Sequence, residues 1–293
     1  MDASDLKFFE AVARLGGMKR AGDELHTVQS NVTGRIRQLE DRLGVQLFFR
    51  NRNGVTLTPA GERLLPYARR AARLFEDARR AAEDDGAPKG LLTIGSLETT
   101  AAIRLSPVLA GYVAAYPEVD LVLRTGTTCE LIEAVLKDRL EGAFVCGPVR
   151  HPDLVAETIF REELALATAP SARGLDALNG MAAVKIVVLR AGCSYRQRLE
   201  EILARRGITG LRQLEFGTIE AIIGCVSAGL GVTLMPIGIL GPAARAGRLA
   251  LHRLDPAESQ VETQFIRRHD GFVSSALDAF LHHARPALVR AAE

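Results

Sequence analysis

The stretch TVQSNVTGRIRQLEDRL, Thr27 to Leu43, has the spacing of one amphipathic helix. Apolar side chains recur at intervals of three and four residues, which places them on one helical face; they are Val28, Val32, Ile36, Leu39 and Leu43. The opposite face is polar and has no acid before Glu40. Amide, hydroxyl and guanidinium groups of this kind hydrogen-bond to the base edges and phosphates of DNA. The pattern predicts that this helix enters a major groove, with contacts from Gln29, Ser30, Asn31, Thr33, Arg35 and Arg37.

A solvated surface helix would show the same pattern, so the flanking sequence decides between the two interpretations. Ser4 is the expected N-cap of a first helix that ends at Gly16-Gly17, and a second helix is expected from Met18 to Leu25. Two helices joined by a tight turn, the second with a polar outer face, form the helix-turn-helix pattern.

A β-hairpin is expected directly after this helix. Asn53-Gly54 lies between two short β-prone segments, which is the strongest local signal for a hairpin. A hairpin at this place makes a winged helix, and it places Arg50 and Arg52 for contact with phosphates or the minor groove. The alternative is that both arginines are solvated turn residues.

A long helix follows, because Thr58 supplies an N-cap and Pro59 occupies the first helical position. The helix is expected to run to about Asp85, before a hinge at residues 84–88. Its small and apolar residues have the heptad spacing of a dimerisation seam. The alternative is a helix packed on its own domain. The seam residues are Leu64, Ala68, Ala71, Phe75, Ala78 and Ala82.

From Leu91 the pattern changes to alternating strands and helices. The expected strands are Leu91–Gly95, Val119–Thr125, Gly142–Cys146, Leu164–Thr168, Val184–Leu189, Leu211–Phe216, Val232–Pro236 and Thr263–Arg267. The expected helices include Thr100–Tyr116, Cys129–Leu140, Tyr195–Arg206, Ile219–Ala228 and Phe272–Ala284. Such alternation predicts parallel α/β sheets. Two such runs in roughly 200 residues predict two lobes with a cleft between them.

Composition restricts the class of protein. The chain has 293 residues and a net charge of +2. Residues 1–57 contain nine Lys and Arg but seven Asp and Glu, so the surplus of positive charge lies in this segment. A membrane span would need a run of about 18 apolar residues, and the sequence has none. The acidic N-terminus does not resemble a signal peptide. The four cysteines lack metal-ligand spacing, and no histidine pair suggests a metal site. We therefore expect a cytoplasmic protein with reduced thiols and neither metal nor cofactor.

Hydroxyl-bearing residues gather where the expected strands end and helices begin. In open parallel sheets, ligands bind at these junctions, and several helix N-termini around one cleft would attract a small anion. The alternative is that each hydroxyl only caps its own helix, as Thr127-x-x-Glu130 and Ser194-x-x-Gln197 suggest. Arg104, Arg196 and Arg198 are candidate countercharges. The candidate ligand residues are Ser96, Thr99, Thr100, Thr127, Thr128, Ser194 and Thr218.

Residues 1–85 resemble the DNA-binding domain of LysR-type transcriptional regulators. The matching segments are Leu6-x-x-Phe9, Arg20-Ala21, Leu25-His26, Gln29-Ser30, Arg35-Ile36-Arg37-x-Leu39-Glu40, Leu43-Gly44-x-x-Leu47-Phe48 and Leu57-Thr58-x-Ala60-Gly61. The rest of the chain is similar to the effector domain of that family, in Leu91-x-x-Ile94-Gly95, Tyr116-Pro117-x-Val119, Gly126-x-x-x-Glu130-Leu131 and Ala228-Gly229-x-Gly231-Val232-x-x-Met235-Pro236. Gly34, inside the expected groove helix, costs about 1 kcal/mol relative to alanine and would allow close approach to DNA or to another helix.

The resemblance implies an α/β protein with an N-terminal winged helix-turn-helix, a linker helix and a two-lobed effector domain like that of periplasmic binding proteins. The expected domains are residues 1–57 for DNA binding, 58–88 for the linker helix and hinge, and 89–293 for the effector domain. Lobe I takes about 89–163 and 264–293, and lobe II about 164–263. The resemblance also implies a double-stranded DNA operator, a small carboxylate effector and a homodimer or homotetramer. RNA polymerase is a candidate partner.

Three other functions compete with an effector-controlled regulator. A regulator of the same family could sense oxidants through Cys193, whose place before a helix could lower the thiol pKa. No resolving cysteine stands beside it in the sequence, so a buried or neutral thiol is the preferred interpretation. A solute-binding protein would suit the second half of the chain but not residues 1–85. An α/β enzyme would need a nucleophile with its base or a cofactor loop, and the sequence has no GxSxG, HExxH or P-loop motif.

Overall fold

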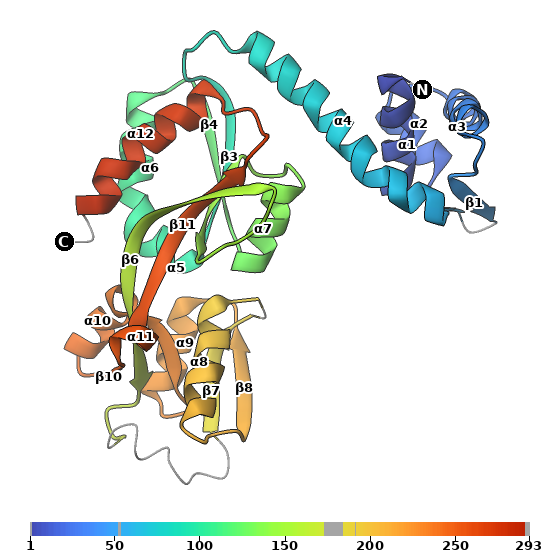
Figure 1. Ribbon diagram of the computed structural model, residues 1–293. Helices are drawn as coiled ribbons and strands as arrows, with labels where there is room; N and C mark the ends of the chain where they lie inside the picture. The colour runs from blue at the N-terminus through green and yellow to red at the C-terminus, as the bar shows by residue number, and fades with distance from the viewer. Residues whose placement is uncertain (1, 52–53, 173–183, 191, 291–293) are drawn as a thin grey trace. The chain divides into compact units, whose positions relative to one another are not determined.

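The computed structural model describes residues 2–51, 54–172, 184–190 and 192–290. The chain forms two compact units, Met1–Asp85 and Gly86–Glu293. The first unit contains a winged helix-turn-helix followed by a long helix, and the second is a mixed α/β domain (Figure 1). The predicted fold class is confirmed.

The first unit contains three short helices, a hairpin and the long helix. Its elements are α1 (Ala3–Leu15), α2 (Met18–Glu24), α3 (Gln29–Leu43), β1 (Phe48–Asn51), β2 (Gly54–Leu57) and α4 (Pro59–Glu83). β1 pairs with β2 in antiparallel register, with Phe48 opposite Leu57. Phe9, Val32, Ile36 and Leu39 are among the fully buried side chains of the core. The amphipathic spacing of α3 therefore buries the middle of the predicted apolar face, Val32, Ile36 and Leu39.

Two helix starts differ from the prediction. Asp2, not Ser4, caps α1, because its carboxylate accepts the Asp5 N–H at 2.9 Å while the Asp5 carboxylate accepts the Asp2 N–H at 3.1 Å. This reciprocal capping box satisfies two backbone donors. Val28 is the extended N-cap of α3 and is 65% exposed, so it does not belong to the buried face. Leu43, at the other end of the helix, is also exposed.

The second unit begins with a strand and a helix that changes its hydrogen-bonding pattern. Its elements up to Cys146 are β3 (Gly90–Ser96), α5 (Glu98–Thr100), the π-helix η1 (Ala101–Leu105), α6 (Ser106–Ala115), β4 (Val119–Thr125), α7 (Thr128–Leu136) and β5 (Gly142–Cys146). The remaining elements are β6 (Leu154–Thr168), β7 (Val184–Leu189), α8 (Ser194–Arg205), β8 (Leu211–Phe216), α9 (Ile219–Ser227), β9 (Thr233–Pro236), α10 (Ile237–Arg245), β10 (Ala250–Arg253), α11 (Pro256–Ser259), β11 (Gln260–Arg268) and α12 (Ser275–Arg290).

The sheets are mixed and not wholly parallel as predicted. β3 pairs in parallel with β4 and β5, and β7 pairs in parallel with β8. β6, by contrast, pairs antiparallel with β9, β10 and β11, and β11 pairs antiparallel with β5. The long strands β6 and β11 run through both halves of the domain (Figure 1). β6 leads the chain from the first half into the second, and β11 leads it back. The two strands therefore run in opposite directions.

These crossing strands place the two lobes around a shared interior. One buried cluster contains Leu131 and Val135 of α7 together with Leu199 and Ile202 of α8. The two helices come from different lobes, so their N-terminal ends lie at the boundary where the candidate ligand residues were expected.

Candidate DNA interface and effector pocket

The polar face of α3 is accessible, while the central residues of its apolar face are fully buried. Gln29, Ser30, Asn31 and Arg37 are exposed, and Val32, Ile36 and Leu39 have no exposed surface. Burial of one face fixes the rotation of the helix, so the exposed face is held in one orientation. Such a surface can place side chains in a groove without refolding.

Two of the polar residues already form hydrogen bonds, one within the helix and one to Thr27, just before it. The Asn31 side-chain amide donates to the Thr27 hydroxyl at 2.9 Å. The Thr33 hydroxyl donates to the backbone carbonyl of Gln29 at 2.9 Å. Asn31 still offers its amide oxygen and a second N–H, and the Thr33 oxygen can still accept.

Arg35 turns towards α1. Its guanidinium lies 3.6 Å from the Asp5 carboxylate and stacks 5.2 Å from the centre of the Phe8 ring. Arg42 pairs with the same carboxylate at 2.9 Å. Asp5 is buried, so the two arginines join α3 to α1. Arg35 therefore has a structural role that the sequence pattern did not indicate.

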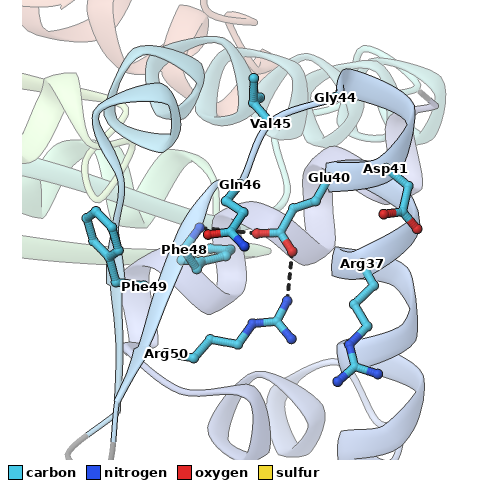
Figure 2. Close-up of a pocket in the computed structure, with 9 residues that line it drawn as sticks. All are labelled: Arg37, Glu40, Asp41, Gly44, Val45, Gln46, Phe48, Phe49 and Arg50. Carbon is cyan, nitrogen blue, oxygen red and sulfur yellow. Dashed lines mark hydrogen bonds and ion pairs between the residues drawn. The ribbon is translucent and has the colours of Figure 1, made fainter.

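Glu40 joins α3 to the hairpin (Figure 2). One carboxylate oxygen accepts the backbone N–H groups of Leu47 at 2.8 Å and Phe48 at 3.2 Å. The other oxygen pairs with Arg50 at 2.7 Å. Glu40 thus fixes both the start of β1 and the guanidinium of Arg50, which is exposed. Arg52, the other predicted hairpin contact, lies outside the described residues.

The groove between α3 and β1 has both charged and apolar walls. Phe49 and Val45 are exposed and line it together with Arg37 and Arg50 (Figure 2). The residues that line it are Arg37, Glu40, Asp41, Gly44, Val45, Gln46, Phe48, Phe49 and Arg50.

The predicted seam of α4 has two parts. Leu64 and Ala68 belong to the core of the first unit, as expected for a helix packed on its own domain. Phe75 is 57% exposed, and its neighbour Leu74 is 66% exposed. Ala78 and Ala82 are exposed, and Ala71 is half-buried. Of the predicted seam, only the second part is exposed; elsewhere on α4, Tyr67 in the first part is also exposed, at 71%.

In the second unit, the two lobes meet through hydroxyl groups. The Ser194 hydroxyl of α8 donates to the Thr128 hydroxyl of α7 at 3.0 Å, and Thr128 also accepts the Cys146 N–H at 3.4 Å. The hydroxyls of Thr99 and Tyr195 are 3.4 Å apart. Four hydroxyls from different parts of the sequence are therefore paired across the lobe boundary, and three of them were predicted.

A small pocket lies beside these pairs, with a cavity volume of about 30 Å³. Its walls come from the ends of β3, β4 and β7 and from the start of α8. The lining residues are Leu97, Glu98, Thr99, Thr125, Gly126, Thr127, Leu189, Arg190, Cys193 and Tyr195. Thr127 has a second role as the N-cap of α7, where its oxygen accepts the Glu130 N–H at 3.3 Å.

Three predicted ligand residues lie elsewhere or are turned inward. Ser96 is fully buried, and its hydroxyl donates to the Leu97 carbonyl at 2.9 Å. Thr218 is exposed and caps α9 by accepting the Ala221 N–H at 3.3 Å. The Thr100 oxygen is buried without a hydrogen-bond partner among the described residues. None of the three lines the pocket, and neither do Thr128 and Ser194, so Thr99 and Thr127 are the predicted ligand residues that line it.

The expected countercharges have other partners. Arg196 pairs with Glu200 at 3.1 Å and Glu215 at 3.2 Å. Arg198 donates to the backbone carbonyls of Ala257, Glu258 and Gln260. Arg104 lies 3.5 Å from the buried Glu162 carboxylate and 5.4 Å from the centre of the Phe160 ring.

The pocket instead brings together Glu98 and Arg190, which the sequence analysis did not select. Burial raises the pKa of Glu98, and the neighbouring Glu220 raises it further, while Arg190 and the Ile219 N–H lower it. Glu98 lies among the hydroxyls of residues 96–100, but a single acid in such a segment has no spacing pattern that marks it.

Cys193 lines the same pocket as a neutral thiol. Burial raises its pKa, and this exceeds the opposing effect of the Tyr195 and Arg196 N–H groups at the start of α8. Desolvation disfavours the thiolate more than the helix N-terminus favours it, so the thiol is buried and neutral and the alternative of a lowered pKa does not hold. In the described part of the chain, no group of three or more His, Cys, Asp or Glu could hold a metal. No described helix is long and apolar enough to cross a membrane.

Comparisons with known proteins agree with this arrangement. Residues 3–62 match the family described as bacterial regulatory helix-turn-helix protein, lysR family. Residues 85–289 match the LysR substrate binding domain. The chain is 44% identical over 285 residues to the HTH-type transcriptional regulator GltR of Bacillus subtilis, covering 97% of this chain and 96% of GltR.

Two solved structures are also similar. Full-length LysG from Corynebacterium glutamicum with bound effector Arg has a TM-score of 0.66 at 21% identity, covering 99% of both chains. Full-length CbnR in complex with its target DNA has a TM-score of 0.52 at 26% identity, covering 100% of both chains.

Proposed function

The chain belongs to the LysR family of DNA-binding transcription regulators, which are not enzymes, and we propose that α3 binds in the major groove of its operator. Gln29, Ser30, Asn31 and Thr33 would face the bases, and Arg37 a phosphate. The observation that carries this proposal is the exposed polar face of α3 opposite three fully buried apolar side chains. The proposed DNA-binding residues also include Arg35, Arg50 and Arg52. Arg35 would act mainly by holding α3 against α1.

A mobility-shift titration with DNA from upstream of the protein's own gene tests this function. At two salt concentrations, affinity should fall as salt rises, because bound cations are released from the phosphates. Arg37→Ala should weaken binding and flatten this dependence by about one unit of slope. Gln38→Ala is the control, since Gln38 is the exposed neighbour and was not assigned a contact. Equal slopes for the wild-type protein and Arg37→Ala would contradict the placement of α3.

We further propose that α4 pairs with the α4 helix of a second chain. Phe75 supports this, because a large exposed apolar side chain is better buried against a partner. Phe75→Asp should lower the fraction of dimer and weaken operator binding more than Arg69→Asp does, since Arg69 is exposed but off the seam. Sedimentation and DNA titration measure both. Equal dimer fractions and equal operator affinities in the two variants would indicate that α4 packs only on its own unit.

A small carboxylate in the pocket between the lobes is the proposed effector. The Thr99–Tyr195 and Ser194–Thr128 pairs support this, since each joins the two lobes at or beside the pocket. LysG, with a similar fold, has bound effector Arg. Closure would bend the crossing strands near Leu164 of β6 and Thr263 of β11. The register between the two strands shifts at Thr263 and Gln264, opposite Phe160 and Thr158. A thermal-shift screen against small carboxylates tests the proposal, and a binder should change operator affinity.

The same proposal includes the wider organisation of the protein. Residues 1–57 would bind DNA, 58–88 would form the linker and hinge, and 89–293 would bind effector, with lobe I at 89–163 and 264–293 and lobe II at 164–263. We also propose that the protein is a tetramer built from two dimers. It would act in the cytoplasm and could contact RNA polymerase there.

A further inference from the structure

Glu40 lies in the last turn of α3, where the partial negative charge of the helix end disfavours a carboxylate. Donors from the hairpin compensate for this. One oxygen accepts the Leu47 and Phe48 N–H groups at 2.8 and 3.2 Å, and the other accepts Nη2 of Arg50 at 2.7 Å (Figure 2). A single side chain therefore joins the end of α3 to both the backbone and a side chain of the hairpin.

The two oxygens of Glu40 have different consequences. The bonds from Leu47 and Phe48 hold the hairpin backbone, and they need only an oxygen acceptor. The bond from Arg50 fixes a side chain, and it adds little stability because the Arg50 side chain is 36% exposed. A guanidinium has several N–H donors, so one that binds Glu40 still has donors for another partner. The ion pair therefore orients Arg50 more than it stabilises the fold.

Arg37 and Arg50 line the same groove between α3 and β1. Figure 2 shows both guanidiniums in the lower part of the view, whereas the Asp41 carboxylate and Val45 lie in the upper part. Arg37 comes two helical turns after Ser30, so both lie on the exposed face of α3. The two arginines are therefore at the end of the groove that is nearer to the start of α3.

A DNA strand would meet both arginines at once. Each strand of B-DNA separates a major groove from a minor groove, so a helix in one and a hairpin at the other lie on either side of the same strand. Arg37 would reach the phosphates of this strand from α3, and Arg50 would reach them from β1. An arginine that is already held in place loses less side-chain freedom on binding, which favours affinity.

We propose that Arg37 and Arg50 bind phosphates of one DNA strand that crosses the groove between α3 and β1, and that Glu40 is the positioning residue that holds Arg50 there. This inference rests on the proposed function, because it takes α3 as the helix in the major groove. It adds that helix and hairpin bind the same strand, and that an acid contributes to the binding of a polyanion.

A double-mutant cycle tests the role of Glu40, with the full-length protein and anisotropy titrations of DNA from upstream of its own gene. Glu40→Gln keeps an oxygen acceptor for the Leu47 and Phe48 N–H groups but removes the charge that holds Arg50. Relative to its effect in an Arg50→Ala background, Glu40→Gln should weaken the binding of otherwise wild-type protein about two- to tenfold. This is the range expected when one arginine must be ordered on binding.

The cycle separates positioning from two other effects of the same substitution. Loss of a negative charge near DNA, or a loosened hairpin, would act in both backgrounds and would cancel. Asp41→Asn is the matched control, because Asp41 lines the same groove, and it should change affinity by the same factor in both backgrounds. Slow hydrogen exchange of the Leu47 and Phe48 amides in Glu40→Gln checks that the hairpin is intact.

A second measurement locates the phosphates without any change to Glu40. In a series of duplexes, one phosphate at a time is replaced by a neutral methylphosphonate. Wild-type affinity should fall at one phosphate whose replacement has no effect in Arg37→Ala, and at another whose replacement has no effect in Arg50→Ala. Within one half-site, both phosphates should belong to the same strand.

Equal effects of Glu40→Gln in the two backgrounds would overturn the role of Glu40, and phosphates on different strands would overturn the shared strand. In either case, tighter binding of the upstream DNA than of a scrambled duplex would leave the proposed function standing. If the wild-type protein binds both duplexes equally, the proposed function fails and the inference fails with it.

Discussion

The polar face of α3 and the hydroxyls at the lobe boundary differ in how their residues are held. On α3, Gln29, Ser30 and Arg37 are exposed on a helix whose other face is buried. At the lobe boundary, Thr128 and Ser194 are already bonded to each other. The first surface is ready for a partner, whereas a ligand in the second must compete with or add to internal bonds. We therefore expect DNA contacts to depend on exposed side chains, and effector contacts to depend on the closure of two lobes.

The largest expected effect tests how firmly the DNA-binding surface is held. Glu40→Ala removes the acceptor for the Leu47 and Phe48 N–H groups and the partner of Arg50. Buried donors without acceptors should destabilise the hairpin by about 2 kcal/mol. Hydrogen exchange in the full-length protein should show faster exchange of both amides. Asp41→Ala, beside it and exposed, is the matched control and should change neither amide. Slow exchange in both variants would mean that other contacts hold the hairpin.

The next prediction separates base contact from phosphate contact on α3. Gln29→Ala should cost about 1–3 kcal/mol of operator binding and reduce the preference for operator over unrelated DNA. Arg37→Ala should instead weaken binding to both DNAs equally. Fluorescence anisotropy with the two DNAs distinguishes these results. A uniform loss of affinity in Gln29→Ala would show that this side chain contacts only the backbone.

At the lobe boundary, the comparison predicts that capping and ligand binding can be separated. Thr128→Val removes the bond from Ser194 and should weaken effector binding, with a loss of stability of about 1 kcal/mol. Thr218→Val removes only the cap of α9, so it should cost about 1 kcal/mol of stability without changing effector affinity. Thermal unfolding and calorimetry on both variants provide the test. Equal effector affinity in the two variants would show that Thr128 is structural only.

The smallest effect concerns Gly34, which lies inside α3. A Cβ atom built there meets nothing within 4 Å, so alanine fits the free protein. Gly34→Ala should stabilise the first unit by about 1 kcal/mol, because alanine favours the helix. If the backbone approaches DNA closely at this point, the same variant should bind its operator more weakly. Higher stability with unchanged operator affinity would show that the backbone of α3 does not contact DNA at Gly34.

The difference between the two regions also explains what the sequence could predict. α3 and its hairpin depend on local signals, such as the spacing of Val32, Ile36 and Leu39, and the bounds of α3 were predicted to within two residues. The role of Arg35 was missed, because its partner Asp5 lies on a different helix.

The lobe boundary depends on contacts between distant segments, which no local pattern records. The hydroxyls were predicted, but the pairing of Thr128 with Ser194 joins residues 66 positions apart. Glu98 and Arg190 meet only because β3 and β7 end at the same pocket. β6 begins ten residues earlier than predicted, at Leu154, because charged residues such as Glu157 and Arg161 interrupt its apolar pattern.

The central claim is that the exposed face of α3 recognises a specific DNA sequence. Anisotropy titrations of the wild-type protein and Gln29→Ala, with DNA from upstream of its gene and a scrambled duplex of equal length, test it most directly. At near-physiological salt, we predict that the wild-type protein binds the upstream DNA at least about a thousandfold more tightly than the scrambled duplex, and that Gln29→Ala loses at least about tenfold of this ratio. Equal affinity of the wild-type protein for both duplexes, or the same ratio in the variant, would contradict the claim.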